Sequence, residues 1–236
     1  IVKVLKANPE IVLATRAYGW FKENPNELCD TVRHLTDDTL FQPGADAIKF
    51  FFRRVGVISG FIVNAEKAKK LSSDLFDGRL YYQMYLAGML MAEGQGYYFS
   101  DVMTLSRDTE APDFGNAGTE KGVFTPGGYK PEGRIHMVEG LLLIAKYIED
   151  TTKIDGVYAG IRKDLANYFY PYIRDQLDLP LYTYIKMINK FRKMGFSNEK
   201  LFYVHAFLGY VLKRRGYDAL IKYIRSKKGG TPRLGI

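Results

Sequence analysis

The chain has 236 residues, of which 47% are hydrophobic and 25% charged, so it can bury a sizeable core as one large domain or one domain with an appendage. Its one cysteine, Cys29, excludes a disulfide framework and a cysteine-cluster metal site within the chain. The net charge is +8 and uneven, because residues 213–236 carry eight Lys or Arg against Asp218 alone.

The first forty residues predict a helix followed by strands. Residues 1–7 have the character of a last helical turn, which Asn8-Pro9 closes because the residue before proline is disfavoured in a helix. Residues 11–18 are rich in β-branched side chains and predict a strand. A polar loop over 20–28 and a short strand over 30–35 follow.

Thr36-Asp37-Asp38 has two interpretations. A hydroxyl and two carboxylates are typical of a helix N-terminus, and this is the interpretation that we favour. The alternative is a pair of carboxylates that bind Mg²⁺ or Mn²⁺ on a diphosphate. After Pro43-Gly44, residues 45–55 predict a further helix.

Residues 57–108 predict a compact unit of strand, helix, loop, helix and strand. An apolar strand ends within 60–64, and a short charged helix follows. A loop rich in Ser, Asp and Gly then leads to an amphipathic helix over 80–91 and a strand over 96–104. Because the polar residues gather at the loop ends, ligands and chemistry are expected there.

The rest of the chain predicts a long loop and then helices. Residues 110–131 are rich in glycine and proline, and we place a domain boundary near 130, between residues 1–130 and a helical region over 131–236. Helices are predicted at 132–150, 157–177, 181–194, 198–214 and 217–226. Pro171 predicts a break, and Gly195 and Gly216 predict helix ends.

Several polar residues are candidates for chemistry. Asp77 precedes the helix at 80–91, where a carboxylate acts either as a general base or as a helix cap. Arg107-Asp108 follows a strand directly, and the arginine either holds a phosphate or a sugar hydroxyl or pairs with Asp108. The three histidines have no second His or Cys at metal-ligand spacing, so we interpret them as structural: His34, His136 and His205.

The basic C-terminal segment alternates with apolar residues over 217–224. This pattern is typical of a helix that lies on anionic lipid headgroups. Nucleic-acid binding and a solvated helix end are the alternatives. No apolar run approaches the roughly 18 residues of a membrane-spanning helix.

Three stretches resemble family-2 glycosyltransferases, especially the abequosyltransferase-like bacterial enzymes that build O-antigens and capsular polysaccharides. They are IVKVLKANPEIVLATRAY at 1–18, VGVISGFIVNAEKAKKL at 55–71 and GRLYYQMYLAGMLMAEGQGYYFSD at 78–101. The first resembles the helix and strand that follow the metal-binding Asp-x-Asp motif of that family. The second resembles the strand at the floor of the acceptor site, and the third the helix that often carries the catalytic base.

The resemblance implies a partial glycosyltransferase A-type α/β fold, followed by a mostly α-helical C-terminal region. It implies an inverting transfer of a sugar from a nucleotide diphosphate sugar to a glycan or lipid-linked acceptor. Asp77 is the carboxylate nearest to the expected base position, and Tyr81, Gln83, Arg107 and Asp108 are the acceptor-side candidates.

The nucleotide-binding half and its Asp-x-Asp motif are expected before Ile1, so the chain is expected to be an inactive piece of a longer enzyme. The ligands of its Mg²⁺ or Mn²⁺ would lie outside this chain. The resemblance implies a cytoplasmic enzyme with peripheral contact to the inner face of the cell membrane, and no nucleic-acid partner. The rival hypothesis is a non-catalytic helical module whose basic face binds nucleic acid or a partner protein.

Overall fold

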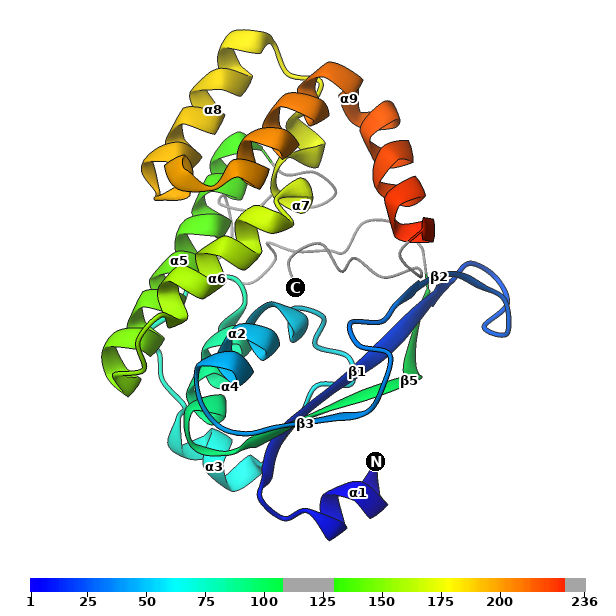
Figure 1. Cartoon of the computed structure of the whole chain (residues 1–236), viewed down its shortest axis with the longest axis vertical. Coiled ribbons are helices and arrows are strands. Elements are labelled where there is room, and N and C mark those ends of the chain that lie inside the picture. Colours follow the sequence, from blue (N-terminus) through cyan, green and yellow to red (C-terminus); the bar gives the residue numbers. More distant parts are fainter. Residues whose placement is uncertain (108–129, 228–236) are drawn as a thin grey trace. The chain divides into compact units, whose positions relative to one another are not determined.

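The computed structural model describes residues 1–107 and 130–227, which fall into two compact units. Of these residues, the first unit holds 1–77, 81–107 and 143–161, and the second unit holds the others. The protein is mixed α/β: all strands of the described residues lie in the first unit, and the regular elements described in the second unit are helices (Figure 1).

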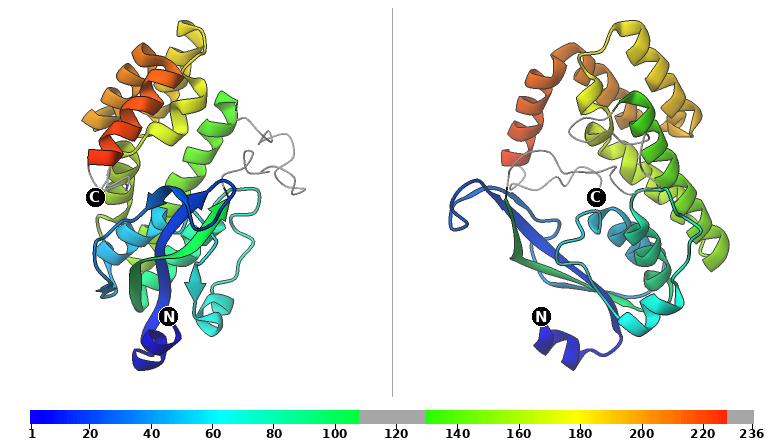
Figure 2. Two further views of the ribbon diagram at one scale, coloured as in Figure 1. Left: turned by 90° about the vertical axis from the view of Figure 1, so that its right-hand side faces the viewer. Right: turned by 180° about the vertical axis from the view of Figure 1, so that it is seen from behind.

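The sheet of the first unit has β1 (Ile11–Phe21) near its centre. The strand order is β2-β1-β5-β3, where β2 is Leu28–Val32, β5 is Gln95–Arg107 and β3 is Thr39–Phe41. The short β4 (Ile62–Val63) also pairs with β1. The β1–β5 pair is parallel and the other pairs are antiparallel. Figure 2 shows β1 and β5 side by side along their length.

Residues 11–17 of β1 are all buried, as expected for a strand covered on both faces. The helices α2 (Ala45–Arg54) and α4 (Tyr82–Glu93) pack on each other, and each also contacts the sheet. Gly96 allows this close packing, because a Cβ there would lie 2.5 Å from the sulfur of Met91 and 2.8 Å from Cζ of Phe51.

Two short helices complete the start of the first unit. The helix α1 (Val2–Ala7) precedes β1. The helix α3 (Ala65–Lys70) begins after Asn64, whose side chain accepts a hydrogen bond from the backbone N–H of Lys67. Asn64 therefore satisfies one of the free donors at the helix N-terminus.

The remaining helices are α5 (Pro131–Thr152), α6 (Val157–Asn167), α7 (Tyr170–Ile173), α8 (Leu181–Lys193) and α9 (Lys200–Lys227). Residues 143–152 of α5 and 157–161 of α6 belong to the first unit. The core of the second unit is aromatic: the ring of Phe169 lies with its centroid 4.9–5.4 Å from those of Tyr172, Phe191, Phe196 and Phe202. Edge-on ring packing of this kind is favourable.

Many sequence predictions are confirmed. Helices are present at the predicted places at 1–7, 45–55, 132–150 and 181–194. The break near Pro171 is also present, because α6 ends at Asn167 and α7 begins at Tyr170. The strand predicted at 11–18 extends to Phe21, and the one predicted at 30–35 is shifted to Leu28–Val32.

The prediction of a helix start at Thr36 is wrong. Residues 36–37 form a bend before β3, and Asp38 accepts hydrogen bonds from the backbone N–H and hydroxyl of Ser100, both at 2.8 Å. The predicted division of residues 198–226 into two helices is confirmed, but the break lies at Lys213, with φ 55° and ψ 177°, instead of at Gly216. At Asp38 a hydrogen bond with a distant residue replaced the helix cap that the sequence favoured.

The predicted domain boundary near 130 stays a prediction; by their contacts, residues 143–161 group with the first unit. The predicted loop over 110–131 lies almost entirely outside the described residues, which resume at Lys130.

Candidate functional site

Arg16 stands out in the first unit because its buried guanidinium has no counter-ion among the described residues. The residue lies in β1 and is 2% exposed. Its Nε donates a hydrogen bond to Thr104 Oγ1 on β5 at 3.0 Å, whereas Nη1 and Nη2 have no hydrogen-bond partner in the described part of the chain. The guanidinium carbon lies 4.9 Å from the centroid of the Tyr18 ring. Burial lowers the pKa of Arg16 because the charged form is poorly solvated.

The turn that contains Gly60 packs directly against this guanidinium. Gly60 has φ +79°, and a Cβ there would lie 2.5 Å from Thr104 Oγ1 and 2.7 Å from Arg16 Cδ. The position therefore requires glycine both for its backbone conformation and for the space. The turn itself is exposed, so only a thin layer of chain separates Arg16 from solvent on this side.

His34 also has a buried side-chain nitrogen without a hydrogen-bond partner among the described residues. It is 6% exposed; its backbone N–H donates to Tyr98 Oη at 2.7 Å, and its Nδ1 makes no hydrogen bond. Burial, and then the positive charges of Arg54, Arg53 and Arg16, hold the pKa of His34 well below its usual value. The imidazole is therefore neutral at pH 7, which spares the cluster a further charge.

Arg54 is the third member, at the C-terminal end of α2. It is 5% exposed, and its guanidinium carbon lies 5.1 Å from the centroid of the Phe50 ring. We refer to Arg16, His34 and Arg54 as the cationic cluster. Burying a cation without a counter-charge is costly, and Arg16 has none among the described residues, so its surroundings are suited to an anionic group such as a phosphate or a carboxylate.

The acidic residues predicted as a possible metal site are engaged elsewhere. Hydrogen bonds from the Ser100 backbone N–H and hydroxyl and from Tyr97 lower the pKa of Asp38, while Asp37 accepts from the Thr36 hydroxyl at 2.7 Å. In the part of the chain that the structure describes, no group of three or more His, Cys, Asp or Glu side chains is placed to hold a metal ion.

Asp77, the predicted base, is exposed in the loop before α4. Its side chain has no partner among the described residues, and its backbone N–H donates to the Asp74 carbonyl at 2.9 Å. Tyr81, with φ 75°, immediately precedes α4. Gln83 Nε2 donates to the Gly56 carbonyl at 3.2 Å, which ties α4 to the segment that carries Gly60. Of the predicted residues, Gln83 is thus linked to the chain that covers Arg16.

Arg107 is placed differently from the prediction of a free phosphate-binding side chain. It lies at the end of β5, where its Nε donates to the Lys22 carbonyl and its Nη2 pairs with Glu23, both at 3.1 Å. Arg107 therefore stabilises the β1–β2 turn. Asp108, its predicted neighbour in the site, lies outside the described residues.

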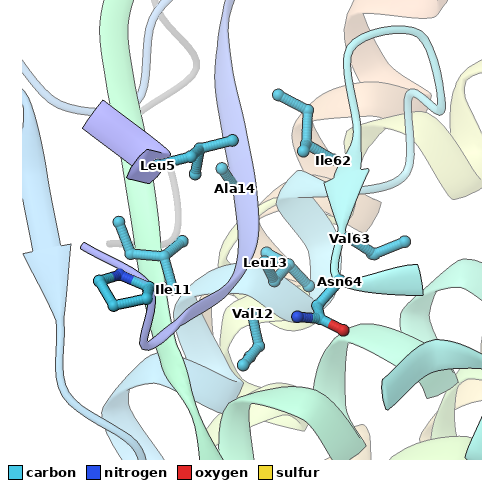
Figure 3. A pocket seen from close by; sticks show the side chains of 9 residues that line it. Leu5, Ile11, Val12, Leu13, Ala14, Ile62, Val63 and Asn64 are labelled. Carbon is cyan, nitrogen blue, oxygen red and sulfur yellow. The ribbon is translucent and has the colours of Figure 1, made fainter. Parts of the chain in front are cut away.

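A separate hollow of about 230 Å³ lies between α1, β1 and β4. Figure 3 shows Leu5 and Ile11 on one side of β1, and Ile62 and Val63 on the other. The lining is apolar apart from Asn64 and carries no charged side chain among the described residues. The cationic cluster, not this hollow, therefore offers the chemistry of a polar site.

Sequence reasoning missed the cationic cluster. The one available signal was an arginine inside an otherwise apolar strand, at position 16. Comparison of the chain with models of protein families, with curated proteins and with solved structures found no match. In the described ranges, no helix is both long and apolar enough to cross a membrane.

Proposed function

We propose that this chain is the acceptor-side part of an inverting glycosyltransferase of the family-2 type. The supporting resemblance rests on three stretches that are distant in the sequence. In the structure these stretches contain β4, most of β1 and the first half of β5, and both β4 and β5 pair with β1. Residues of β1 and of the Gly60 turn, which belong to two of the stretches, meet at the cationic cluster.

The observation that carries the proposal is the buried guanidinium of Arg16, which has two Nη atoms without a partner. Sugar nucleotides and lipid-linked acceptors both carry diphosphates, and arginine binds phosphate oxygens with parallel N–H donors. Arg16 would hold such an anion while neutral His34 donates a further hydrogen bond to it. An anion there would also offset the charge that the burial of Arg16 leaves unbalanced.

The reaction would be a single in-line displacement. Asp77 would remove the proton from an acceptor hydroxyl as its oxygen attacks the anomeric carbon of the donor. The new carbon–oxygen bond would form on the face opposite the diphosphate, and the bond to the diphosphate oxygen would break, leaving its electron pair there. A Mg²⁺ or Mn²⁺ ion, held outside this chain, would supply charge stabilisation for the departing diphosphate.

The test uses the gene product that contains this chain together with the expected nucleotide-binding half. A panel of sugar nucleotides with Mn²⁺ should show hydrolysis or transfer. Asp77→Asn should lower kcat by at least about a hundredfold, because general-base catalysis contributes on that scale. Arg16→Gln should mainly raise KM. Asp46→Asn changes an exposed carboxylate on α2 and should leave turnover unchanged.

Near-normal turnover of Asp77→Asn would remove that residue from the mechanism. Silence of the whole gene product with every sugar nucleotide, together with salt-sensitive binding to oligonucleotides, would instead favour a non-catalytic binding module.

A further inference from the structure

The first half of α9 is apolar on two opposite faces. Phe202, His205, Ala206 and Gly209 are buried on the inner face. On the opposite side are four large side chains that we call the outer face: Tyr203 (41% exposed), Val204 (45%), Phe207 (68%) and Val211 (59%). Their spacing of one, three and four residues places them on a single stripe of the helix. A helix with apolar side chains on two opposite faces is normally packed against other structure on both of them.

The outer face is part of a wider concentration of exposed apolar residues. Of the nineteen large hydrophobic residues that are exposed in the described chain, ten lie in α8 and α9. They include Tyr182, at 80% the most exposed of all, and Ile185 on α8. Such a concentration is more than the scattered exposure that soluble surfaces show, and indicates an interaction surface.

The charge of the two helices is predominantly positive. Residues 181–215 contain eight Lys or Arg and a single acid, Glu199. Glu199 is already engaged, since its carboxylate lies 3.5 Å from Nε of Arg162. Lys186, Lys190 and Lys193 line a groove of about 380 Å³ along α8, together with Tyr182 and Ile185. The helices thus present aromatic and aliphatic side chains beside unneutralised cations.

The two helices hold this arrangement rigidly. The Tyr184 hydroxyl of α8 donates to the Ala206 carbonyl of α9 at 2.8 Å. The rings of Tyr184 and Tyr210 stack with their centroids 4.7 Å apart. The exposed side chains therefore project from packed helices, and their exposure does not come from a loose chain end.

We propose that the outer face of α9, with the exposed side of α8, docks on the surface of an anionic lipid bilayer. Aromatic and aliphatic side chains enter the headgroup region, and the lysines and arginines meet the negative surface potential. Charge complementarity selects this occupant, because Lys and Arg outnumber acids eight to one over 181–215 and the one acid there, Glu199, is paired with Arg162; the exposed Asp178 lies just before α8. The site differs from the basic segment over 217–226 that the sequence predicted, and the inference does not depend on the proposed transferase activity.

The test is flotation of the full chain with vesicles of phosphatidylcholine, with and without phosphatidylglycerol. We expect binding to the anionic vesicles alone, and weaker binding as NaCl rises, because salt screens the attraction. The double variant Phe207→Ser with Val211→Ser should bind at least about tenfold more weakly, since the buried apolar area is lost. Leu143→Ser, at an exposed apolar position on α5, is the matched control and should bind like the wild type.

Circular dichroism should give the same helix content for all variants, because the changed side chains are exposed. Absence of binding to either vesicle, or equal binding by the double variant, would overturn the proposal. The main rival is that the outer face binds a second copy of the chain, which size-exclusion chromatography with light scattering detects. A dimer that the double variant abolishes would assign the outer face to that second copy and overturn the proposal of lipid binding.

Discussion

Arg174 of the second unit and Arg16 of the first unit differ in whether a carboxylate balances their charge. In the second unit, Arg174 forms two parallel hydrogen bonds with the carboxylate of Asp218, at 2.6 and 2.8 Å, and the Tyr170 hydroxyl donates to the same carboxylate at 2.5 Å. In the first unit, Arg16 is more deeply buried but has no carboxylate partner within residues 1–107 and 130–227. Arginines that stabilise the fold carry their own anion, whereas Arg16 lacks one.

Two further arginines of the second unit are also paired. Arg134 pairs with Asp175 at 2.5 Å, and Arg162 lies 3.5 Å from Glu199. In the first unit the exposed Arg107 pairs with Glu23, so the contrast rests on Arg16. It points to Arg16 as a residue of the first unit that keeps its positive charge for a ligand.

The largest effect is expected from Asp218→Asn. The change leaves Arg174 partly buried without its counter-charge, and should lower the free energy of unfolding by about 2 kcal/mol after allowance for the one-third exposure of the pair. Denaturant unfolding measures the change. Asp150→Asn, which breaks an exposed pair with Lys146 on α5, should have no measurable effect.

The same carboxylate should give the protein an acid-sensitive part of its stability. Burial alone would raise the pKa of Asp218, but the hydrogen bonds from Arg174 and Tyr170 lower it below the usual 3.8. A depressed carboxyl pKa contributes stability above the unfolded value and loses it as pH falls through the folded one. Wild type should therefore lose more stability than Asp218→Asn as pH drops below about 4; parallel pH profiles would contradict this.

The next effect concerns the turn over Arg16. Gly60→Ala should cost about 2 kcal/mol of unfolding free energy, because it adds both a left-handed backbone strain and a clash with Arg16 and Thr104. Gly156→Ala is the matched control: its φ is +80°, but no atom lies within 4 Å of the added Cβ. That variant should lose only about 1 kcal/mol, from the backbone term. Equal losses in thermal or denaturant unfolding would refute the close packing at Gly60.

The smallest expected change in the free energy of unfolding is an increase. Arg16→Met should raise the free energy of unfolding by about 1 kcal/mol in buffer without phosphate or sulfate, since it removes a buried charge that has no partner. Added phosphate should then stabilise the wild type but not the variant, because a ligand bound only to the folded state adds stability. A less stable Arg16→Met protein would show that the guanidinium is already satisfied within the chain.

Local signals explain why much of the helical structure was predictable. Asn64 caps α3, and Gly195, with φ +104°, follows the end of α8; both depend on residues adjacent in the sequence. The interaction that overturned the prediction at Asp38 comes from Ser100, which is 62 residues away. No periodicity or capping pattern encodes a partner at that separation.

The candidate site was less predictable than the fold for the same reason. Asp77 was predicted from its place before a recognisable helix start, and Gln83 from the resemblance of residues 78–101. Arg16 was not, because its significance depends on the absence of a carboxylate around it and on the approach of Gly60 from 44 residues further along. Only the folded chain shows which charges are left unpaired.

The strand β1 also provides a built-in optical probe. Arg16, Tyr18 and Trp20 are every second residue of this strand, so their side chains lie on the same face of the sheet. The Tyr18 ring lies under the guanidinium and meets the ring of Trp20 edge-on at 6.2 Å. Because Trp20 is the only indole of the chain, its fluorescence emission should respond when an anion engages Arg16, so that occupancy can be followed without any label.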